Sequence, residues 1–325
     1  MKNIAIVATG GTIAGKGENG KASIYHAGEI DVDTIIETIP SIKNLANITS
    51  YQLLNLDSNE MNENIWINLS NMLNDLLLDH SIDGVVVTHG TDLIEETAYF
   101  LNLTLNTSKP VVLTGAMRPA SATSADGPYN LYQAVCLASK DESYNKGVMV
   151  LFSNTIYSGR DIQKMNNYKI DAFDQKSFGF LGYMQDSDVY FFSNTFKCHT
   201  GNSLFAGKYE HLPKVAIAYF YGGADANILY YLSKENEGIV IIGSGNGNYN
   251  KEWMNAIIDL SGKGILFVRA SRVPLGIVFE DEVFDPTHCC IPANTLSGQK
   301  ARILLMLSLT KTHDISQLKK IFQEY

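Results

Sequence analysis

Two threonines stand where a hydroxyl could act on a small ligand. Thr12 follows the apolar run from Ile4 to Ala8, and Thr91 follows the run from Gly84 to Thr88, each after an intervening glycine. An apolar run that ends in glycine is typical of a buried strand breaking into a tight loop. A hydroxyl in such a loop becomes a nucleophile when a neighbouring base accepts its proton. The strongest functional interpretation of Thr12 is therefore a catalytic nucleophile.

The segment around Thr12 excludes a phosphate-binding loop, but simpler structural explanations stay open for Thr12, Ser58 and Asp92. A phosphate-binding loop requires the spacing GxGxxG or GxxxxGK[ST], which the glycines around Thr12 do not provide. A plain turn at the end of a strand remains possible for Thr12. Ser58 taken alone has the same explanation as a turn residue. Asp92, with Glu95 three residues later, also fits a helix N-terminus.

The elements that position these residues follow from the apolar patterns. The first part of the chain predicts strands over residues 4–8, 47–56, 84–88, 110–113 and 147–152. It predicts helices over residues 33–39, 65–78 and 126–138, and a further helix that follows residues 89–92 and ends at 103. Continuous apolar runs are typical of parallel strands buried on both faces. We expect a doubly wound, mainly parallel α/β sheet whose strand ends share one crevice. Thr12, Ser58 with Asn59, and Thr91 with Asp92 would line that crevice.

A second, smaller series of strands and helices follows. It predicts strands over residues 215–219, 238–242 and 264–268, and helices that include 299–309 and 315–322. Residues 193–212 are the least periodic stretch and are rich in Asn, Gly, Ser and Lys. The sequence therefore predicts a larger N-terminal domain over residues 1–192, a linker over 193–212, and a smaller C-terminal α/β domain over 213–325.

Composition restricts the class of partner. The chain has 325 residues, of which 45% are hydrophobic and 18% charged, as is ordinary for a globular enzyme. Its formal net charge is −9 with no offsetting basic cluster, which argues against binding to nucleic acid or to an anionic membrane. No apolar run approaches the roughly 18 to 20 residues of a membrane span.

Cysteine usage and the first residues favour a cytoplasmic location. The four cysteines contain no CxxC pair, and the adjacent Cys289 and Cys290 cannot easily bridge each other. We therefore expect reduced thiols, with no disulfide framework or zinc site. Met1 leads almost directly into the first strand, without room for a signal peptide. A periplasmic location is expected instead if a signal peptide has been removed.

Several segments together resemble the bacterial L-asparaginase family, most closely its type II branch. The two signature segments are Ala8 to Gly15 and Thr88 to Asp92. The likeness extends over essentially the whole chain, through the segments 95–101, 115–119, 124–128, 245–248 and 299–302. Either threonine segment alone would be weak, but both at this separation and with these flanks are highly specific.

The resemblance implies a role for each matching residue. Thr12 matches the threonine taken as the nucleophile, and Tyr25 the tyrosine that closes over the substrate and helps to activate that hydroxyl. Thr91 and Lys164 match the second threonine and its lysine, which are proposed to activate water and transfer protons. Asp92 matches the carboxylate that binds the substrate's α-amino group.

The remaining matches concern substrate binding and assembly. Ser58 matches the hydroxyl that meets the substrate's α-carboxylate, and Asn59 and Ala116 belong to the substrate-binding set. Asn248 and an acid near Glu282 match groups that a neighbouring subunit contributes to the pocket. The resemblance implies a homotetramer built from two intimate dimers, and no metal or cofactor.

Two departures from the family pattern affect these matches. Asp57, Ser58 and Asn59 stand where the family commonly has Gly-Ser-Gln, so we expect a modest change in affinity or a rotated substrate rather than loss of activity. The segment from Val273 to Asp285 is one residue shorter than the usual pattern, so Glu280 is an alternative to Glu282 as the partner-subunit acid.

The expected activity is hydrolysis of L-asparagine to L-aspartate and ammonia through a threonine ester. A glutaminase-asparaginase with substantial L-glutamine activity is the nearest alternative. A subunit of a tRNA-dependent amidotransferase would call for an RNA-facing domain and a basic surface, which the sequence does not contain. A non-catalytic amino-acid-binding protein is disfavoured because both threonines, Tyr25, Asp92 and Lys164 are retained.

Overall fold

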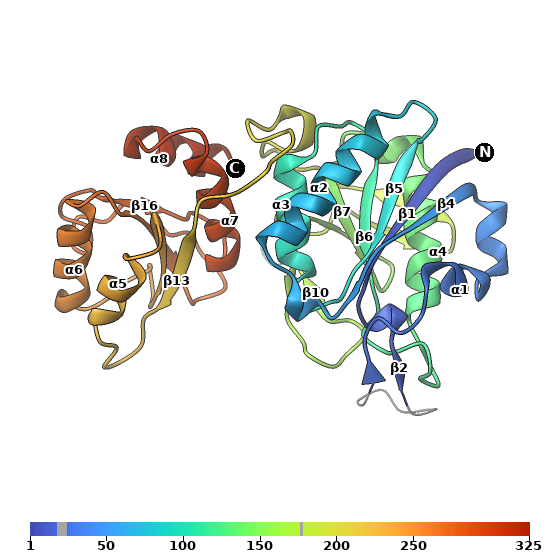
Figure 1. Ribbon diagram of the computed structural model, residues 1–325, viewed down its shortest axis with the longest axis horizontal. Helices are drawn as coiled ribbons and strands as arrows, with labels where there is room; N and C mark the ends of the chain where they lie inside the picture. The colour runs from blue at the N-terminus through green and yellow to red at the C-terminus, as the bar shows by residue number, and fades with distance from the viewer. Residues whose placement is uncertain (18–24, 176–177) are drawn as a thin grey trace. The chain divides into compact units, whose positions relative to one another are not determined.

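The chain forms two compact units, Met1–Tyr209 and Glu210–Tyr325, each with its own sheet (Figure 1). The computed structural model describes residues 1–17, 25–175 and 178–325. Within these residues, no helix combines the length and the apolar character needed to span a membrane.

The first unit is organised around a sheet of eight described strands in the order β12-β11-β8-β7-β6-β5-β1-β4. The strands are β1 (Lys2–Gly10), β4 (Ala46–Leu56), β5 (Gly84–Thr88), β6 (Val111–Thr114), β7 (Val148–Phe152), β8 (Thr155–Ser158), β11 (Gly182–Gln185) and β12 (Asp188–Phe191). The five neighbouring strands β7, β6, β5, β1 and β4 are parallel. The other three, β8, β11 and β12, run antiparallel to their neighbours in the sheet.

Helices cover both faces of the parallel part of this sheet (Figure 1). They are α1 (Val32–Glu37), α2 (Glu63–Leu78), α3 (Ile94–Thr104) and α4 (Gly127–Ala138). Two short ribbons lie outside the large sheet, β2 (Lys16–Gly17) with β3 (Tyr25–His26) and β9 (Gln163–Lys164) with β10 (Phe173–Asp174). Short 3-10 turns occur at Thr12–Ala14, Pro40–Asn44, Ser58–Glu60, Asp141–Ser143 and Thr200–Asn202.

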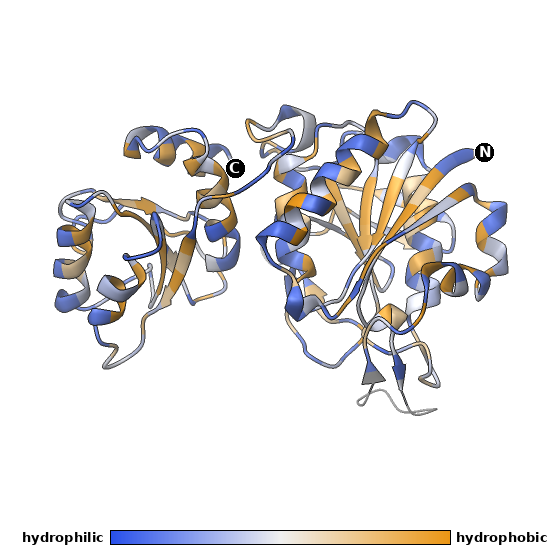
Figure 2. Cartoon of the chain, viewed as in Figure 1, coloured by the Kyte–Doolittle hydropathy of each residue, from blue (hydrophilic) through white to orange (hydrophobic). Residues whose placement is uncertain are grey.

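The apolar pattern of β1 explains its central place. Ile4, Ala5, Ile6 and Val7 are all fully buried, although their side chains point alternately to opposite faces. Ile4 and Ile6 join a core cluster that includes residues of α1 and α4. A strand with this pattern stabilises the fold only when both faces are covered, as the doubly wound arrangement does. Figure 2 shows the same apolar centre in the hydropathy of the parallel strands.

The boundary between the units lies inside the stretch that the sequence suggested as a linker. Residues up to Tyr209 belong to the first unit, so residues 193–209 are not a free connection. Phe205 in this stretch is fully buried, and the amide group of Asn71 in α2 hydrogen-bonds both main-chain polar groups of Tyr209. Polar composition concealed this docking, because side-chain amides rather than apolar periodicity fix the segment.

The second unit is a parallel sheet of four described strands in the order β13-β14-β15-β16. The strands are β13 (Val215–Tyr219), β14 (Gly238–Gly243), β15 (Leu266–Ser271) and β16 (Cys290–Pro292). The helices are α5 (Asn227–Leu232), α6 (Lys251–Ser261), α7 (Gly298–Leu309) and α8 (Ile315–Glu324). A core formed by α5, α6 and one face of the sheet surrounds the fully buried Trp253.

The predicted fold class is confirmed. A larger, mainly parallel α/β unit is followed by a smaller α/β unit, as the sequence predicted. The sequence did not indicate β16, a three-residue strand, and it placed the strand that became β15 two residues too early.

Candidate active site

Three of the predicted site residues follow neighbouring strands of the large sheet. Thr12 begins the turn after β1, Ser58 begins the turn after β4, and Thr91 lies three residues beyond β5. β1 lies between β4 and β5, and all three strands are parallel. Their carboxyl ends therefore meet at one edge of the sheet, as the sequence predicted.

The strand order also reverses here. From β1 the chain moves to β4 on one side, then crosses to β5 on the other side and continues outward to β6 and β7. In open α/β sheets, ligands bind in the crevice outside the carboxyl ends of the strands where the order reverses. Thr12 and Thr91 follow the two strands, β1 and β5, that flank this point.

Glycines bring the three loops into backbone contact. A Cβ on Gly11 would lie 2.4 Å from the main-chain nitrogen of Gly90, and a Cβ on Gly90 would lie 2.7 Å from the Oγ of Ser58. Gly11 also has a φ of 83°, which L side chains rarely adopt. The residues just before Thr12 and Thr91 are therefore packed directly on one another, with Ser58 against the second.

Lys164 connects the second threonine to the neighbouring acid. Its Nζ donates hydrogen bonds to Oγ1 of Thr91, 2.7 Å away, and to Oδ1 of Asp92, 2.5 Å away. The Thr91 residue is buried, whereas the Asp92 side chain is 53% exposed. One ammonium group therefore contacts both a buried hydroxyl and a carboxylate that is open to solvent, an arrangement suited to moving protons at a bound polar substrate.

Glu95 fixes the main chain of this lysine. Lys164 lies in the β9–β10 ribbon, outside the large sheet, and its main-chain N–H donates to Oε2 of the buried Glu95 at 2.7 Å. Helix α3 begins only at Ile94 and has no side-chain N-cap. Glu95 lies in the first turn of α3, as the helix-start interpretation expected, but the described helix start has no side-chain cap and both carboxylates contact Lys164.

The comparisons with known proteins agree over the full length of the chain. Residues 3–197 match the family described as "Asparaginase, N-terminal", and residues 214–322 match the "Glutaminase/Asparaginase C-terminal domain". The chain belongs to the asparaginase family.

Individual relatives of this asparaginase family member cover almost the whole chain. "L-asparaginase 2" of Escherichia coli is 40% identical, over 100% of this chain and 94% of that protein. "Glutaminase-asparaginase" of Acinetobacter glutaminasificans is 41% identical, over 99% of each. The crystal structure of the "Probable Cytoplasmic L-asparaginase" of Campylobacter jejuni is 44% identical, with a TM-score of 0.96 and full coverage of both chains.

Two family-matched residues contribute less to the described site. The main chain of Tyr25 lies in β3, but its side chain is outside the described residues. Ala116 is fully buried, and its methyl group belongs to the core between the sheet, α1 and α4. The Ala116 side chain is therefore not available to contact a ligand.

The residues matched to the neighbouring subunit lie in the second unit. Asn248 closes a tight turn with Ser244, in which the two residues exchange main-chain hydrogen bonds. The buried Oδ1 of Asn248 has no hydrogen-bond partner among the described residues. Glu282 is exposed, whereas Glu280 forms an ion pair with Lys319 at 2.7 Å, which lowers the pKa of the Glu280 carboxyl. This pairing favours Glu282 over Glu280 as the acid available to another molecule.

The side chain of Asn59 is tied to Asp57 rather than projecting from its turn. Its Nδ2 donates to Oδ1 of Asp57 at 2.8 Å, and its main-chain N–H donates to the same oxygen at 3.0 Å. Asn59→Gln should lengthen the side chain and loosen this pair, so we expect a change of a few fold in KM for both amides with little change in kcat. Steady-state kinetics with L-asparagine and L-glutamine test this. Unchanged KM values for both substrates would contradict it.

His89 has a structural role. Its ring is completely buried; Nδ1 contacts the main-chain oxygen of Gly90 at 2.7 Å, and Nε2 contacts Oγ1 of Thr97 at 3.0 Å. Nε1 of Trp66 donates to that same threonine oxygen at 2.9 Å. A neutral ring that carries its proton on Nδ1 satisfies the whole chain of hydrogen bonds.

Burial lowers the pKa of His89 to about 4, so acid should destabilise the fold through this ring. Between pH 6.5 and 4 the unfolded histidine binds a proton that the folded one does not. The free energy of unfolding should therefore decrease as the pH is lowered through this window, by up to about 3 kcal/mol in total. Urea unfolding from pH 4 to 7 measures this dependence. His89→Gln should remove that part of the slope, and an unchanged slope would contradict the assignment.

Proposed function

We propose that this protein is an L-asparagine amidohydrolase that converts L-asparagine and water to L-aspartate and ammonia. One observation carries the proposal: Lys164 contacts both Thr91 and Asp92 at the strand-order reversal, where the Thr12 loop packs on the Thr91 loop. A hydroxyl and an acid on one ammonium, with the loop that carries Thr12 packed against the loop that carries Thr91, fit a small zwitterionic amide.

The reaction proceeds in two steps, and in both of them the side-chain carbonyl carbon of the substrate is attacked. The Oγ1 of Thr12 attacks the side-chain amide carbon of asparagine, the C–N bond breaks, and the hydroxyl proton passes to the departing ammonia. Water then attacks the resulting ester, which releases L-aspartate and restores the Thr12 hydroxyl. A positioned acid–base group contributes roughly 10² to 10⁴ in rate to such steps. We assign this role to Lys164 acting through Thr91, with Tyr25 assisting Thr12.

Substrate binding follows from the charges of a free amino acid. Lys164 occupies Oδ1 of Asp92, so we assign Oδ2 to the α-ammonium group. Ser58 is buried against Gly90, and we assign its hydroxyl to the α-carboxylate. A carboxylate for the ammonium group and a hydroxyl for the carboxylate match the two charges of a small zwitterion. Asn59 and the main chain of Ala116 complete the proposed set.

L-Glutamine is the second substrate that the relatives support. One relative with 41% identity is named a glutaminase-asparaginase, and the two activities differ only in relative kcat/KM. The test is ammonia release from L-asparagine and L-glutamine at matched concentrations, with protein of known oligomeric state. Ammonia release from neither amide would overturn the proposed function.

We further propose that Asn248 and Glu282 complete the site of a neighbouring subunit in a homotetramer. The unpartnered Oδ1 of Asn248 and the exposed Glu282 carboxylate support this assignment. A sedimentation experiment at enzyme working concentrations measures the oligomeric state, and a monomer with full activity would contradict the proposal.

A cytoplasmic location remains our prediction. The names of the relatives include both locations, "Probable L-asparaginase periplasmic" in Haemophilus influenzae at 42% identity and the cytoplasmic enzyme of Campylobacter jejuni. Fractionation of the native cell, with activity measured in each compartment, decides between them.

A further inference from the structure

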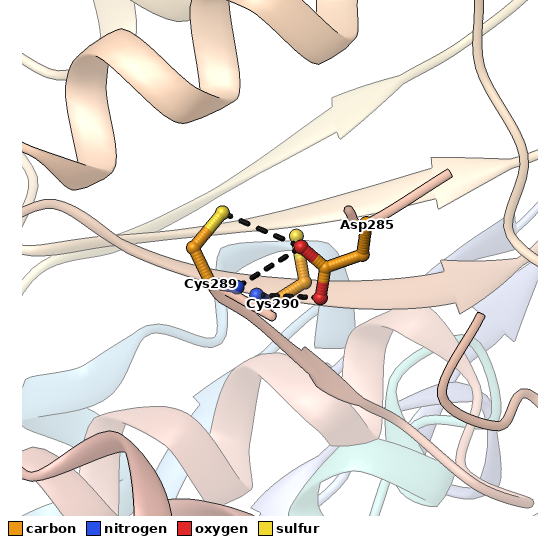
Figure 3. A group of neighbouring side chains, drawn as sticks. All are labelled: Asp285, Cys289 and Cys290. Carbon is orange, nitrogen blue, oxygen red and sulfur yellow. Dashed lines mark hydrogen bonds between the residues drawn. The ribbon is translucent and has the colours of Figure 1, made fainter. Parts of the chain in front are cut away.

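Two adjacent cysteines and an acid form a compact cluster in the second unit. Asp285 and Cys289 lie in the segment that connects β15 to β16, and Cys290 is the first residue of β16. One ligand atom from each side chain lies within 4.8 Å of the others. Figure 3 shows the carboxylate of Asp285 beside the two cysteines, with hydrogen bonds to both of their main-chain nitrogens and to Sγ of Cys289.

The carboxylate is fixed before any ligand binds. Oδ1 of Asp285 accepts the main-chain N–H of Cys289, and Oδ2 accepts that of Cys290, both at 3.0 Å. Each carboxylate oxygen has two lone-pair sites: Oδ2 keeps one for a further partner, and the second site of Oδ1 faces the thiol of Cys289. The same two hydrogen bonds fix the main chain of both cysteines relative to the acid. The cluster is therefore preorganised.

The thiols lie where a metal ion could replace their protons. Sγ of Cys289 lies 3.5 Å from Oδ1 of Asp285, and Sγ of Cys290 lies 3.7 Å from the hydroxyl of Tyr249. That hydroxyl in turn donates to the main-chain oxygen of Phe284 at 2.8 Å. Asp285 and Cys290 are buried, whereas Cys289 is half-buried and gives access from solvent.

We propose that Asp285, Cys289 and Cys290 bind a soft divalent cation of the Zn²⁺ and Cd²⁺ class. Thiolate ligands select this class, and a carboxylate is an accepted third ligand. On binding, both thiols release their protons to water, two metal–sulfur bonds and one metal–oxygen bond form, and no group is oxidised or reduced. Water fills the fourth position, on the solvent side of Cys289.

The dimensions of the cluster suit such an ion. With Zn–S distances of about 2.3 Å, the ligand atoms of a tetrahedral site lie roughly 3.8 Å apart. The cluster therefore needs a contraction of about 1 Å or less to take such an ion. The absence of a CxxC pair led us to expect no zinc site from the sequence. An acid four residues before a cysteine pair matches no common zinc motif.

Titration of the reduced full-length protein with Cd²⁺ tests this site directly. The probe is the ultraviolet charge-transfer band that Cd–thiolate bonds produce, together with the metal-dependent shift of the thermal unfolding midpoint. We expect one equivalent of Cd²⁺ to saturate the band. Cys289→Ser and Cys290→Ser should each weaken Cd²⁺ binding by more than about tenfold, since losing even a supporting residue costs that much.

Cys198→Ser is the matched control, because Cys198 is also half-buried but lies in the first unit. It should keep the band, the stoichiometry and the thermal shift, and Zn²⁺ should displace Cd²⁺ from it as from the unaltered protein. The proposal is overturned if the unaltered protein gives no saturable band, or if the band and the thermal shift persist in both Cys289→Ser and Cys290→Ser. Circular dichroism confirms that each variant is folded.

Discussion

Thr12→Val and Thr91→Val should each reduce kcat for L-asparagine by at least about 10³-fold, the order expected when a group that reacts or transfers protons is removed. Valine keeps the branched shape of threonine and replaces only the hydroxyl with a methyl group. Both threonines are buried, so the matched shape leaves little cavity, although Lys164 loses its contact with the hydroxyl in Thr91→Val. Ammonia release, measured with enough enzyme to follow slow turnover, gives the result.

Thr12→Ser and Thr91→Ser are the controls, because serine keeps the hydroxyl and loses the methyl group. Each should retain far more activity than the matching valine variant. Intact-mass analysis of rapidly quenched reactions adds a second readout. If Thr12 forms the ester, Thr91→Val should accumulate an acyl-enzyme that Thr12→Val cannot form. Substantial activity in both valine variants would end the catalytic assignment.

The parts of the fold that the sequence predicted well are those in which burial alone decides the pattern. β5 has the predicted bounds, because five consecutive buried residues leave no other interpretation. The predicted strand ends at residue 268, just before Arg269, whereas β15 continues to Ser271. In the structure Arg269 is 1% exposed, and its Nη2 donates to the main-chain oxygen of Asn246 at 2.9 Å. A buried charge with a distant main-chain partner leaves no periodic signal.

Some residues of the candidate site could likewise be located from the apolar pattern, and others could not. Thr12, Ser58 and Thr91 could be located because each follows a predicted strand, and the edge where parallel strands end is a general property of the fold. Lys164 could not, because it lies in a two-residue strand of a separate ribbon; only the family resemblance indicated it. Glu95 was interpreted as a helix-start acid, since its partner is 69 residues away in the chain.

The second large effect that we expect is the loss of kcat when the ammonium group of Lys164 is removed. Lys164→Met should reduce kcat by about 10² to 10⁴, because methionine fills a similar volume but cannot donate to Thr91 or Asp92. Lys164→Arg keeps the charge with a different donor geometry, so its kcat should lie between those of the unaltered enzyme and of Lys164→Met. Steady-state ammonia release measures kcat and KM for each variant. Lys164→Met turning over at the unaltered rate would contradict a role for Lys164 in proton transfer.

Glu95→Gln separates positioning from chemistry, because Glu95 contacts the main chain of Lys164 and not its ammonium. A glutamine oxygen can still accept the Lys164 N–H, but the contact loses the negative charge that shortens and strengthens it. We therefore expect kcat to fall by about tenfold, less than in Lys164→Met, with KM nearly unchanged. In the double variant Glu95→Gln with Lys164→Met, the loss should equal that of Lys164→Met alone, because Glu95 acts only through this lysine. Additive losses would instead show that Glu95 acts on the site independently of Lys164.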